Sequence, residues 1–285
     1  MMDDGVNMGT ALRMDEESFT RLSTYVTREY GIKLPVAKKS MLESRLNKKV
    51  RSLGLSSYKE FLDFLFAENG NTLELLNVVD LITTNKTDFF REPAHFQYLT
   101  EEFLAPYLRD NRRRPMKIWS AGCSTGEEPY TIIMALEEFK RTHGDFGYSI
   151  LASDLSTRVI QAAYQGIYEM EKAAPIPLEL KRRYFLRSAK NPSLVRVKPE
   201  YRKKLHFKRI NFMDADFGIL KSDLDVIFCR NVLIYFDKAT QERVINKFCR
   251  HLRPGGLLFL GHSESIIGMN LPLVQVRPTV YRVVE

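Results

Sequence analysis

The residues best suited to chemistry lie in a loop of small side chains that ends at two glutamates. The run from Ile118 to Tyr130, IWSAGCSTGEEPY, has the form of a strand, a loop through Gly122 and Gly126, and then a helix. Small side chains at the end of a strand let a ligand approach the backbone closely. The first turn of the following helix offers unpaired N–H groups to that ligand. The sequence therefore predicts a ligand loop of the nucleotide-fold type.

The charge of this loop favours a cationic ligand over a dinucleotide. The spacing G-x-G-x-x-G is missing, and Glu127 and Glu128 would repel a pyrophosphate. The sulfonium and amino group of S-adenosylmethionine are positive, so the same carboxylates would attract that cofactor. The next predicted strand ends at Asp154, where nucleotide folds place an acid that binds the ribose hydroxyls. Taken singly, Glu128 and Asp154 could equally be helix caps.

A further group of polar residues follows a later apolar strand. The run from Asp223 to Phe228, DLDVIF, leads into Cys229, Arg230 and Asn231 and on to Tyr235. Ligands of open α/β sheets bind at the carboxyl ends of the strands. The residues after Phe228 therefore belong to the ligand-binding end of the predicted sheet.

The elements that position these residues change character along the chain. Residues 1–90 read as short amphipathic helices, with apolar side chains at three- and four-residue steps in Phe19, Leu22 and Val26. From Met116, brief β-rich runs at 117–120, 148–152, 225–228 and 257–260 alternate with helices, which is typical of βαβ units around a parallel sheet. We therefore predict an all-α domain over 1–90 and an α/β domain over 91–285. Within the latter, apolar runs at 184–186, 194–197 and 205–207 predict a small antiparallel insertion over about 181–212.

Composition excludes several classes of protein. The three cysteines are widely spaced, and the five histidines occur singly, so neither a disulfide framework nor a metal site is predicted. No apolar stretch reaches the ~18 residues of a membrane span, and Met1–Asp4 lacks the basic-then-apolar order of a signal peptide. We expect a soluble cytoplasmic protein without a metal.

A basic segment in the N-terminal region suggests an acidic partner. The chain carries a net charge of +8, and residues 28–51 hold eight basic and two acidic side chains. Residues 35–54 read as one helix with Leu42, Leu46, Val50 and Leu53 on one face. Such a basic face is usually only solvated surface, but its density here favours docking. The predicted docking residues on the opposite face are Lys38, Arg45, Lys48, Lys49 and Arg51.

With these residues in view, nearly the whole chain resembles the chemotaxis receptor methyltransferase family, CheR. The matching motifs are TTNKTDFFRE over 83–92, the loop over 120–130, Asp154, Asn211 and FCRNVLIYF over 228–236. The resemblance implies a helical receptor-docking domain, a linker, a Rossmann-like class I methyltransferase domain and a small β-subdomain. It implies an S-adenosylmethionine-dependent protein-glutamate O-methyltransferase that releases S-adenosylhomocysteine.

The family also implies roles for individual residues. Arg91 and Tyr235 would lie nearest the transferring methyl group and act in catalysis. Without the family, a linker arginine in an ion pair and a core tyrosine would be the simpler interpretations. The implied cofactor-binding residues are Asn85, Thr87, Arg91, Gly122, Glu128, Asp154, Asn211, Phe212, Arg230 and Asn231.

The implied partner is the cytoplasmic helical bundle of a methyl-accepting chemoreceptor, to which the enzyme would be recruited at membrane receptor arrays. Some family members also bind a C-terminal receptor tether through a glycine-containing loop of the β-subdomain. The corresponding loop here, 188–193, contains no glycine, so the sequence argues against tether binding.

Two alternatives remain open at this point. A nucleic-acid methyltransferase would share the fold and profit from the basic helix. Against it, enzymes that methylate base amino groups commonly carry an acidic residue or Asn, paired prolines and an aromatic where this chain has Arg230-Asn231. A non-catalytic docking module that senses S-adenosylmethionine would require a lost pocket residue, and the sequence shows none.

Overall fold

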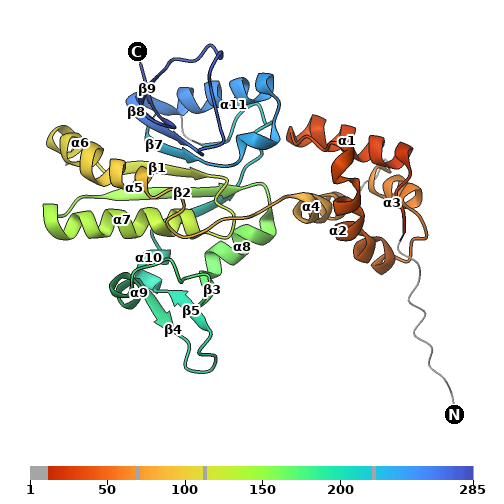
Figure 1. The fold of residues 1–285 in the computed structure, drawn as a ribbon, viewed down its shortest axis with the longest axis horizontal. Coiled ribbons are helices and arrows are strands. Elements are labelled where there is room, and N and C mark those ends of the chain that lie inside the picture. Colours follow the sequence, from red (N-terminus) through yellow and green to blue (C-terminus); the bar gives the residue numbers. More distant parts are fainter. Residues whose placement is uncertain (1–11, 68–70, 112–113, 220–222, 285) are drawn as a thin grey trace. The chain divides into compact units, whose positions relative to one another are not determined.

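The computed structural model describes residues 12–67, 71–111, 114–219 and 223–284 (Figure 1). It divides into two compact units, one through Thr83 and one from Thr84. Segment 84–90, which we had assigned to the N-terminal domain, is thus part of the second unit. There Phe89 is buried and packs edge-on against Tyr168 and Phe185, at centroid distances of 4.9 and 5.7 Å.

The described part of the first unit is helical. It contains α1 (Glu16–Tyr30), the short 3-10 helix η1 (Val36–Lys38), α2 (Lys39–Ser52), α3 (Tyr58–Leu65) and α4 (Thr72–Ile82). Asp15 caps α1 by accepting from the Ser18 amide at 2.7 Å, and Gly31 ends the helix in the left-handed conformation. The prediction of an all-α domain is confirmed.

The single helix predicted over 35–54 is shorter and broken. Pro35 is extended, a 3-10 turn follows, and the α-helix begins only at Lys39. The predicted apolar face is nevertheless present, because Leu42, Leu46 and Val50 are fully buried.

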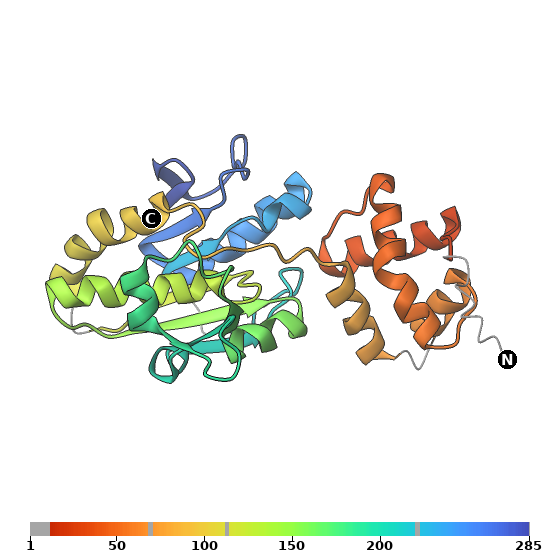
Figure 2. The same ribbon diagram turned by 60° about the horizontal axis from the view of Figure 1, so that its bottom comes forward.

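The second unit is built on a seven-stranded sheet in the order β6-β2-β1-β7-β8-β10-β9. Figure 2 shows this unit from a second direction. Its parallel strands are β1 (Met116–Ala121), β2 (Tyr148–Asp154), β6 (Leu205–Arg209), β7 (Leu224–Cys229) and β8 (Leu252–Leu260). The four runs predicted as strands lie in β1, β2, β7 and β8. The antiparallel hairpin β9 (Leu273–Arg277) and β10 (Val280–Val283) completes one edge and follows the last of the four predicted runs.

Helices cover both faces of this sheet (Figure 1). The chain enters through α5 (Ala94–Gln97), the π-helical turn η2 (Tyr98–Phe103) and α6 (Leu104–Asn111), which share one hydrophobic core with α7 (Glu127–His143) and with Ile118, Phe228 and Phe259 of the sheet. The other helices are α8 (Thr157–Gln165), α9 (Leu178–Tyr184), α10 (Pro199–Arg202), the 3-10 turn η3 (Leu233–Tyr235) and α11 (Lys238–His251). Trp119, next to Ile118, packs instead on Phe248 of α11 at 5.2 Å between centroids. This alternation along β1 follows the two-residue period of a strand.

The antiparallel insertion exists, but its third strand differs from our prediction. The small sheet has the order β3-β5-β4, formed by β3 (Ile167–Glu169), β5 (Leu194–Val197) and β4 (Phe185–Arg187) (Figure 1). The predicted third run, 205–207, is β6 and pairs in parallel with β2 of the main sheet. The true third strand directly follows α8, whose last residue precedes Gly166 at φ 60°. With only three residues, β3 is too short to show an alternating pattern.

No described helix of this chain has both the length and the apolar character needed to cross a membrane.

Candidate functional site

The glycine loop lies at the carboxyl end of β1, beside the loop that follows β7. Gly122 has φ 90°, and a Cβ added there would lie 2.4 Å from Cγ2 of Val232. The two loops therefore approach so closely that only glycine fits. Gly126 also has a positive φ, of 97°, which favours glycine. In an open α/β sheet, ligands bind at the carboxyl ends of the strands where the strand order reverses. Here that place lies between β1 and β7.

Asp154 at the end of β2 holds the glycine loop in place. Its Oδ2 accepts from the amide of Ser124 at 2.8 Å, and its Oδ1 accepts from the amide of Ser156 at 3.0 Å. Ser124 itself has φ 47°, an uncommon conformation for serine. The cap of α8 is Ser156, whose hydroxyl accepts from the Val159 amide. Asp154 is therefore a loop support and not a simple cap of that helix.

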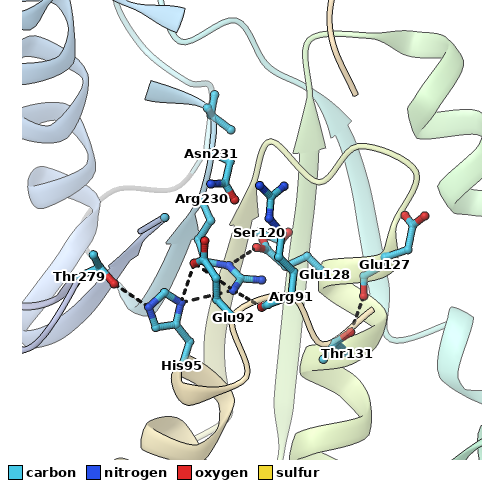
Figure 3. Close-up of polar contacts among 12 residues, drawn as sticks. Arg91, Glu92, His95, Ser120, Glu127, Glu128, Thr131, Arg230, Asn231 and Thr279 are labelled. Carbon is cyan, nitrogen blue, oxygen red and sulfur yellow. Dashed lines mark hydrogen bonds and ion pairs between the residues drawn. The ribbon is translucent and has the colours of Figure 1, made fainter. Parts of the chain in front are cut away.

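Glu128 and Arg230 form a buried ion pair below the loop (Figure 3). Arg230 Nε donates to Glu128 Oε2 at 2.7 Å, and the Ser120 hydroxyl donates to Glu128 Oε1 at 2.6 Å. Both charged residues are only 7% exposed. Buried charges need partners of opposite sign, and here two predicted site residues supply them to each other.

The rest of the Arg230 guanidinium is also engaged. Nη1 donates to the main-chain oxygen of Arg91 at 2.6 Å, and it lies 3.7 Å from Oε2 of Glu92. The guanidinium carbon lies 5.0 Å from the ring centre of Phe96 and 5.7 Å from that of Phe228. Arg230 is thus held by hydrogen bonds, by charge and by two aromatic rings.

His95 completes this network and must be neutral. Its Nδ1 lies 3.3 Å from Nη1 of Arg230, which can only donate, so Nε2 carries the proton. Nε2 therefore donates to the hydroxyl of Thr279 at 2.8 Å, and that hydroxyl donates on to the Pro278 carbonyl at 2.7 Å. Burial, followed by the charges of Arg230 and His262, lowers the pKa of His95 to about 3. Sequence analysis missed this residue because a single histidine gives no signal of its partners.

The segment 85–92 runs beside these residues. The Ser124 hydroxyl donates to the main-chain oxygen of Asn85 at 2.9 Å, and Arg91 Nη1 donates to that of Lys86 at 3.1 Å. Lys172 binds the Thr87 carbonyl and pairs with Asp88 at 2.7 Å. Of the predicted site residues, Asn85 thus contacts the glycine loop directly, and Thr87 and Arg91 follow it in the same segment.

Glu264 is a second residue that sequence analysis missed. It is 6% exposed, and its carboxylate accepts from the amides of Asn231, Val232, Leu233 and Gly261, at 2.5 to 2.9 Å. Burial raises the pKa of Glu264 against the effect of these four donors. Its carboxylate fixes the loop that carries Asn231 and leads to the half-buried Tyr235 in η3. The run Gly261–Ser265, GHSES, directly after the last parallel strand, was the available signal.

Phe212 does not lie with its ring in this group. Its ring packs edge-on against Trp119, Phe217 and Phe248, at centroid distances of 5.3 to 6.1 Å. The ring of Phe212 is therefore part of the core against α11, and its predicted place in the cofactor site remains a prediction. The neighbouring Asn211 lies after β6, where its Oδ1 accepts from the Met213 amide at 3.1 Å.

Three potential metal ligands come together, although none had been predicted from isolated histidines. Glu92, His95 and His262 each place one ligand atom within 4.8 Å of the others. The Arg230 guanidinium already lies against both Glu92 and Nδ1 of His95. The positive charge beside these ligand atoms is therefore that of Arg230. We interpret Glu92, His95 and His262 as part of the arginine network.

The predicted docking residues divide into two groups. Arg45 donates through Nη1 to the carbonyls of Ile82 and Thr83, both at 2.9 Å, and Lys49 pairs with Glu74 at 2.5 Å with side chains 21% and 17% exposed. Both residues hold α4, and their docking role remains a prediction. Lys48 and Arg51 are exposed, and Lys38 is half-buried.

Comparisons with known proteins agree along the whole chain. The family model described as "CheR methyltransferase, all-alpha domain" matches residues 17–83, and "CheR methyltransferase, SAM binding domain" matches residues 85–281. The chain is 40% identical to "Chemotaxis protein methyltransferase 2" of Pseudomonas aeruginosa, over 93% of this chain and 92% of that protein. It is 37% identical to "Chemotaxis protein methyltransferase" of Borreliella burgdorferi over 95% of both chains, and 35% identical to that of Escherichia coli over 97% and 94%. The two family models match both units of the structure, the helical N-terminal unit and the unit that contains the glycine loop, Asp154 and the Glu128–Arg230 pair. The chain therefore belongs to the CheR methyltransferase family.

Proposed function

We propose that this S-adenosylmethionine-dependent methyltransferase of chemotaxis transfers its methyl group to glutamate side chains of chemoreceptors. The observation that carries the proposal is that Asp154 at the end of β2, Glu128 in the first turn of α7 and Asn231 after β7 meet at the glycine loop that follows β1. The names of the relatives supply the setting in chemotaxis. The identity of the modified side chain rests on the family resemblance and on the chemistry below.

The residues present fit the cofactor. The side-chain oxygen of Asn231 is buried and has no hydrogen-bond partner among the described residues, so it can accept from a ligand amine. Gly122 lets the loop after β7, which carries Asn231, lie directly against the glycine loop. We propose that the cofactor is held by Asn85, Thr87, Gly122, Glu128, Asp154, Asn211 and Asn231.

The bound S-adenosylmethionine supplies a methyl group on a positively charged sulfur. A glutamate carboxylate is already ionised near pH 7, so the protein needs no general base. What the chain must supply is position, and we assign this to Arg91 and Tyr235. The Arg91 guanidinium has five donor N–H groups, and among the described residues it donates to the Lys86 carbonyl.

Methyl transfer followed by mild base tests the proposal. Membranes that contain chemoreceptors would be incubated with the protein and methyl-labelled S-adenosylmethionine, and volatile methanol collected after base treatment. Release of labelled methanol is expected from a carboxyl methyl ester, and Arg91→Ala should lose it. Base-stable label would indicate methylation of nitrogen or nucleic acid, and cofactor binding without any transfer would indicate a sensing module.

The partner we propose is the acidic helical bundle of a receptor's cytoplasmic part, at membrane receptor arrays. Of the predicted docking residues, Lys48 and Arg51 are exposed and Lys38 is half-buried, and we propose that they face this partner. We do not propose tether binding. The β4–β5 loop has no glycine and is closed by Asn191, whose Oδ1 accepts from the Ser193 amide and hydroxyl at 3.1 and 2.8 Å.

A further inference from the structure

The backbone on both sides of Arg91 is in an unfavourable conformation. Phe90 has φ 53° and Glu92 has φ 55°, both in the left-handed region that residues other than glycine rarely occupy. Such backbone strain persists only where surrounding contacts hold it.

Three contacts from separate elements hold this segment. The amide of Phe90 donates to the hydroxyl of Thr131 on α7 at 3.2 Å. The amide of His262, just after β8, donates to Oε1 of Glu92 at 3.2 Å. Between them, Arg230 at the end of β7 donates to the main-chain oxygen of Arg91, and its 2.6 Å bond is the shortest of the three.

Arg230 makes this contact from a position that is itself fixed. Glu128 holds its Nε, Phe96 and Phe228 lie against its guanidinium, and the side chain is only 3% exposed. With Nε and Nη1 both engaged, its planar fork spans Glu128 and the Arg91 carbonyl at once (Figure 3). A lysine at this position has one ammonium and cannot reproduce that two-point geometry.

We propose that Arg230 is a positioning residue: it locks the strained Phe90–Glu92 segment and thereby presents the Arg91 guanidinium to the reaction. The family resemblance had placed Arg230 among the residues that bind the cofactor, and this inference gives it a different role. The part that concerns catalysis rests on the proposed function of Arg91. The part that concerns the segment depends on the structure alone.

The test compares Arg230→Lys with Arg253→Lys as a matched control. Arg253 also pairs with a buried carboxylate, Asp225 at 2.7 Å, and also contacts a second partner, Asn111 at 3.1 Å. Hydrogen exchange of peptide 84–93 measures how firmly Arg230 holds the Phe90–Glu92 segment, and it does not depend on activity. In Arg230→Lys, exchange in this peptide should accelerate at least about tenfold while exchange in β2 stays as in the wild type, since only the local contact is lost.

Kinetics then measure how the contact between Arg230 and the Phe90–Glu92 segment affects catalysis. In Arg230→Lys the kcat should fall by about 100-fold, the order expected for a catalytic group misplaced by about 1 Å, while the cofactor Kd stays within about threefold. Arg253→Lys should leave both unchanged. Should Arg230→Lys fold poorly, Arg230→Ala with added methylguanidine provides the second measurement, because the ligand can fill the place between Phe96 and Phe228 and should restore exchange protection and kcat.

Unchanged exchange in peptide 84–93 overturns the inference. A cofactor Kd weakened more than about tenfold with normal exchange also overturns it, because Arg230 would then be a cofactor-binding residue. If exchange accelerates but the wild type itself forms no base-labile methyl ester, the proposed function fails and the lock stands. If the wild type is active and kcat of the variant is normal, the catalytic part of the inference fails alone.

Discussion

His95 is a buried histidine that must lose its proton when the chain folds. Its pKa falls to about 3 in the folded state, whereas an unfolded histidine titrates near 6.5. Between these values the unfolded chain binds one proton more, so the free energy of unfolding contributed by this group rises with pH and levels off above about 6.5. Acid conditions should therefore weaken the Arg230 network before most carboxylates titrate.

We predict that His95→Gln flattens this dependence. Below pH 6 the wild type should lose up to about 1.4 kcal/mol of stability per pH unit through His95, and the variant should lack that part of the slope. Urea unfolding at pH 5, 6 and 7 measures the difference. The exposed His206, changed to Gln, serves as the control with the wild-type slope. Parallel slopes for wild type and His95→Gln would contradict the assignment.

Glu264 supports the loop after β7 through four main-chain hydrogen bonds. In Glu264→Gln, the side-chain NH2 group would replace one carboxylate oxygen and face main-chain N–H groups, which are donors too. Those buried N–H groups would then lack an acceptor. We expect a loss of about 1–3 kcal/mol in the free energy of unfolding, measured by urea denaturation. Glu102→Gln, in a pair with Arg277 whose side chains are 46% and 56% exposed, should change stability by less than about 0.5 kcal/mol. Equal effects of the two variants would show that Glu264 is not an important support.

Asp154 combines a loop support with its proposed contact to the cofactor. Asp154→Ala should weaken S-adenosylmethionine binding by about 1–3 kcal/mol, the usual cost of removing hydrogen bonds to a charged group. Calorimetry checks this, and unchanged affinity would remove Asp154 from the site. Because the Ser124 amide also loses its acceptor, Ser156→Ala provides a comparison that disturbs the α8 cap but leaves the Asp154 carboxylate in place.

At the scale of elements, the sequence predicted what depends on local pattern. The glycine loop, the acid at the end of β2 and the strands β1, β2, β7 and β8 each occupy a continuous run, and the structure contains them all. Errors arose where a strand's partner is distant. Residues 205–207 look like any short strand, and only their pairing with β2 assigns them to the main sheet.

The same limit applies to the site. Arg230 was predicted as a site residue from its position after β7, but its contacts reach Arg91 and His95, far away along the chain. Helical periodicity placed Arg45 and Lys49 on a polar face, and it carried no information that α4 would lie there. Partners that come from another element leave no mark in local spacing.

Arg45 provides a test at this scale, because it closes the C-terminal end of α4. The last carbonyls of a helix lack intrahelical donors, and Arg45 supplies donors to those of Ile82 and Thr83. Arg45→Ala should therefore destabilise the N-terminal unit by about 1–3 kcal/mol in denaturant unfolding. Lys48→Ala, on the exposed side of the same helix, should stay within about 0.5 kcal/mol of the wild type. Matching values would mean that Arg45 does not hold α4.

At the scale of the whole molecule, a net charge of +8 and the basic segment 28–51 favour encounter with an acidic partner. The choice of residues for testing this now follows from the structure. Changing Arg45 or Lys49 would disturb the contacts of α4 and would confuse stability with docking. Lys48 and Arg51 are both exposed on α2, so removing their side chains disturbs less of the packing of the unit.

The double variant Lys48→Ala/Arg51→Ala should raise the apparent KM for receptor severalfold at low salt and leave the cofactor Kd unchanged, because it removes encounter electrostatics and no part of the site. The screening length falls from ~10 Å at 0.1 M salt to ~3 Å at 1 M, so wild-type activity should decline with salt while that of the double variant responds less. Lys59→Ala on α3, exposed and paired with Asp63 at 3.1 Å, is the control for removal of a positive charge elsewhere in the unit. Receptor kinetics of the double variant that match the wild type at low salt, where electrostatic attraction is strongest, would identify this side of α2 as solvated surface and not a docking face.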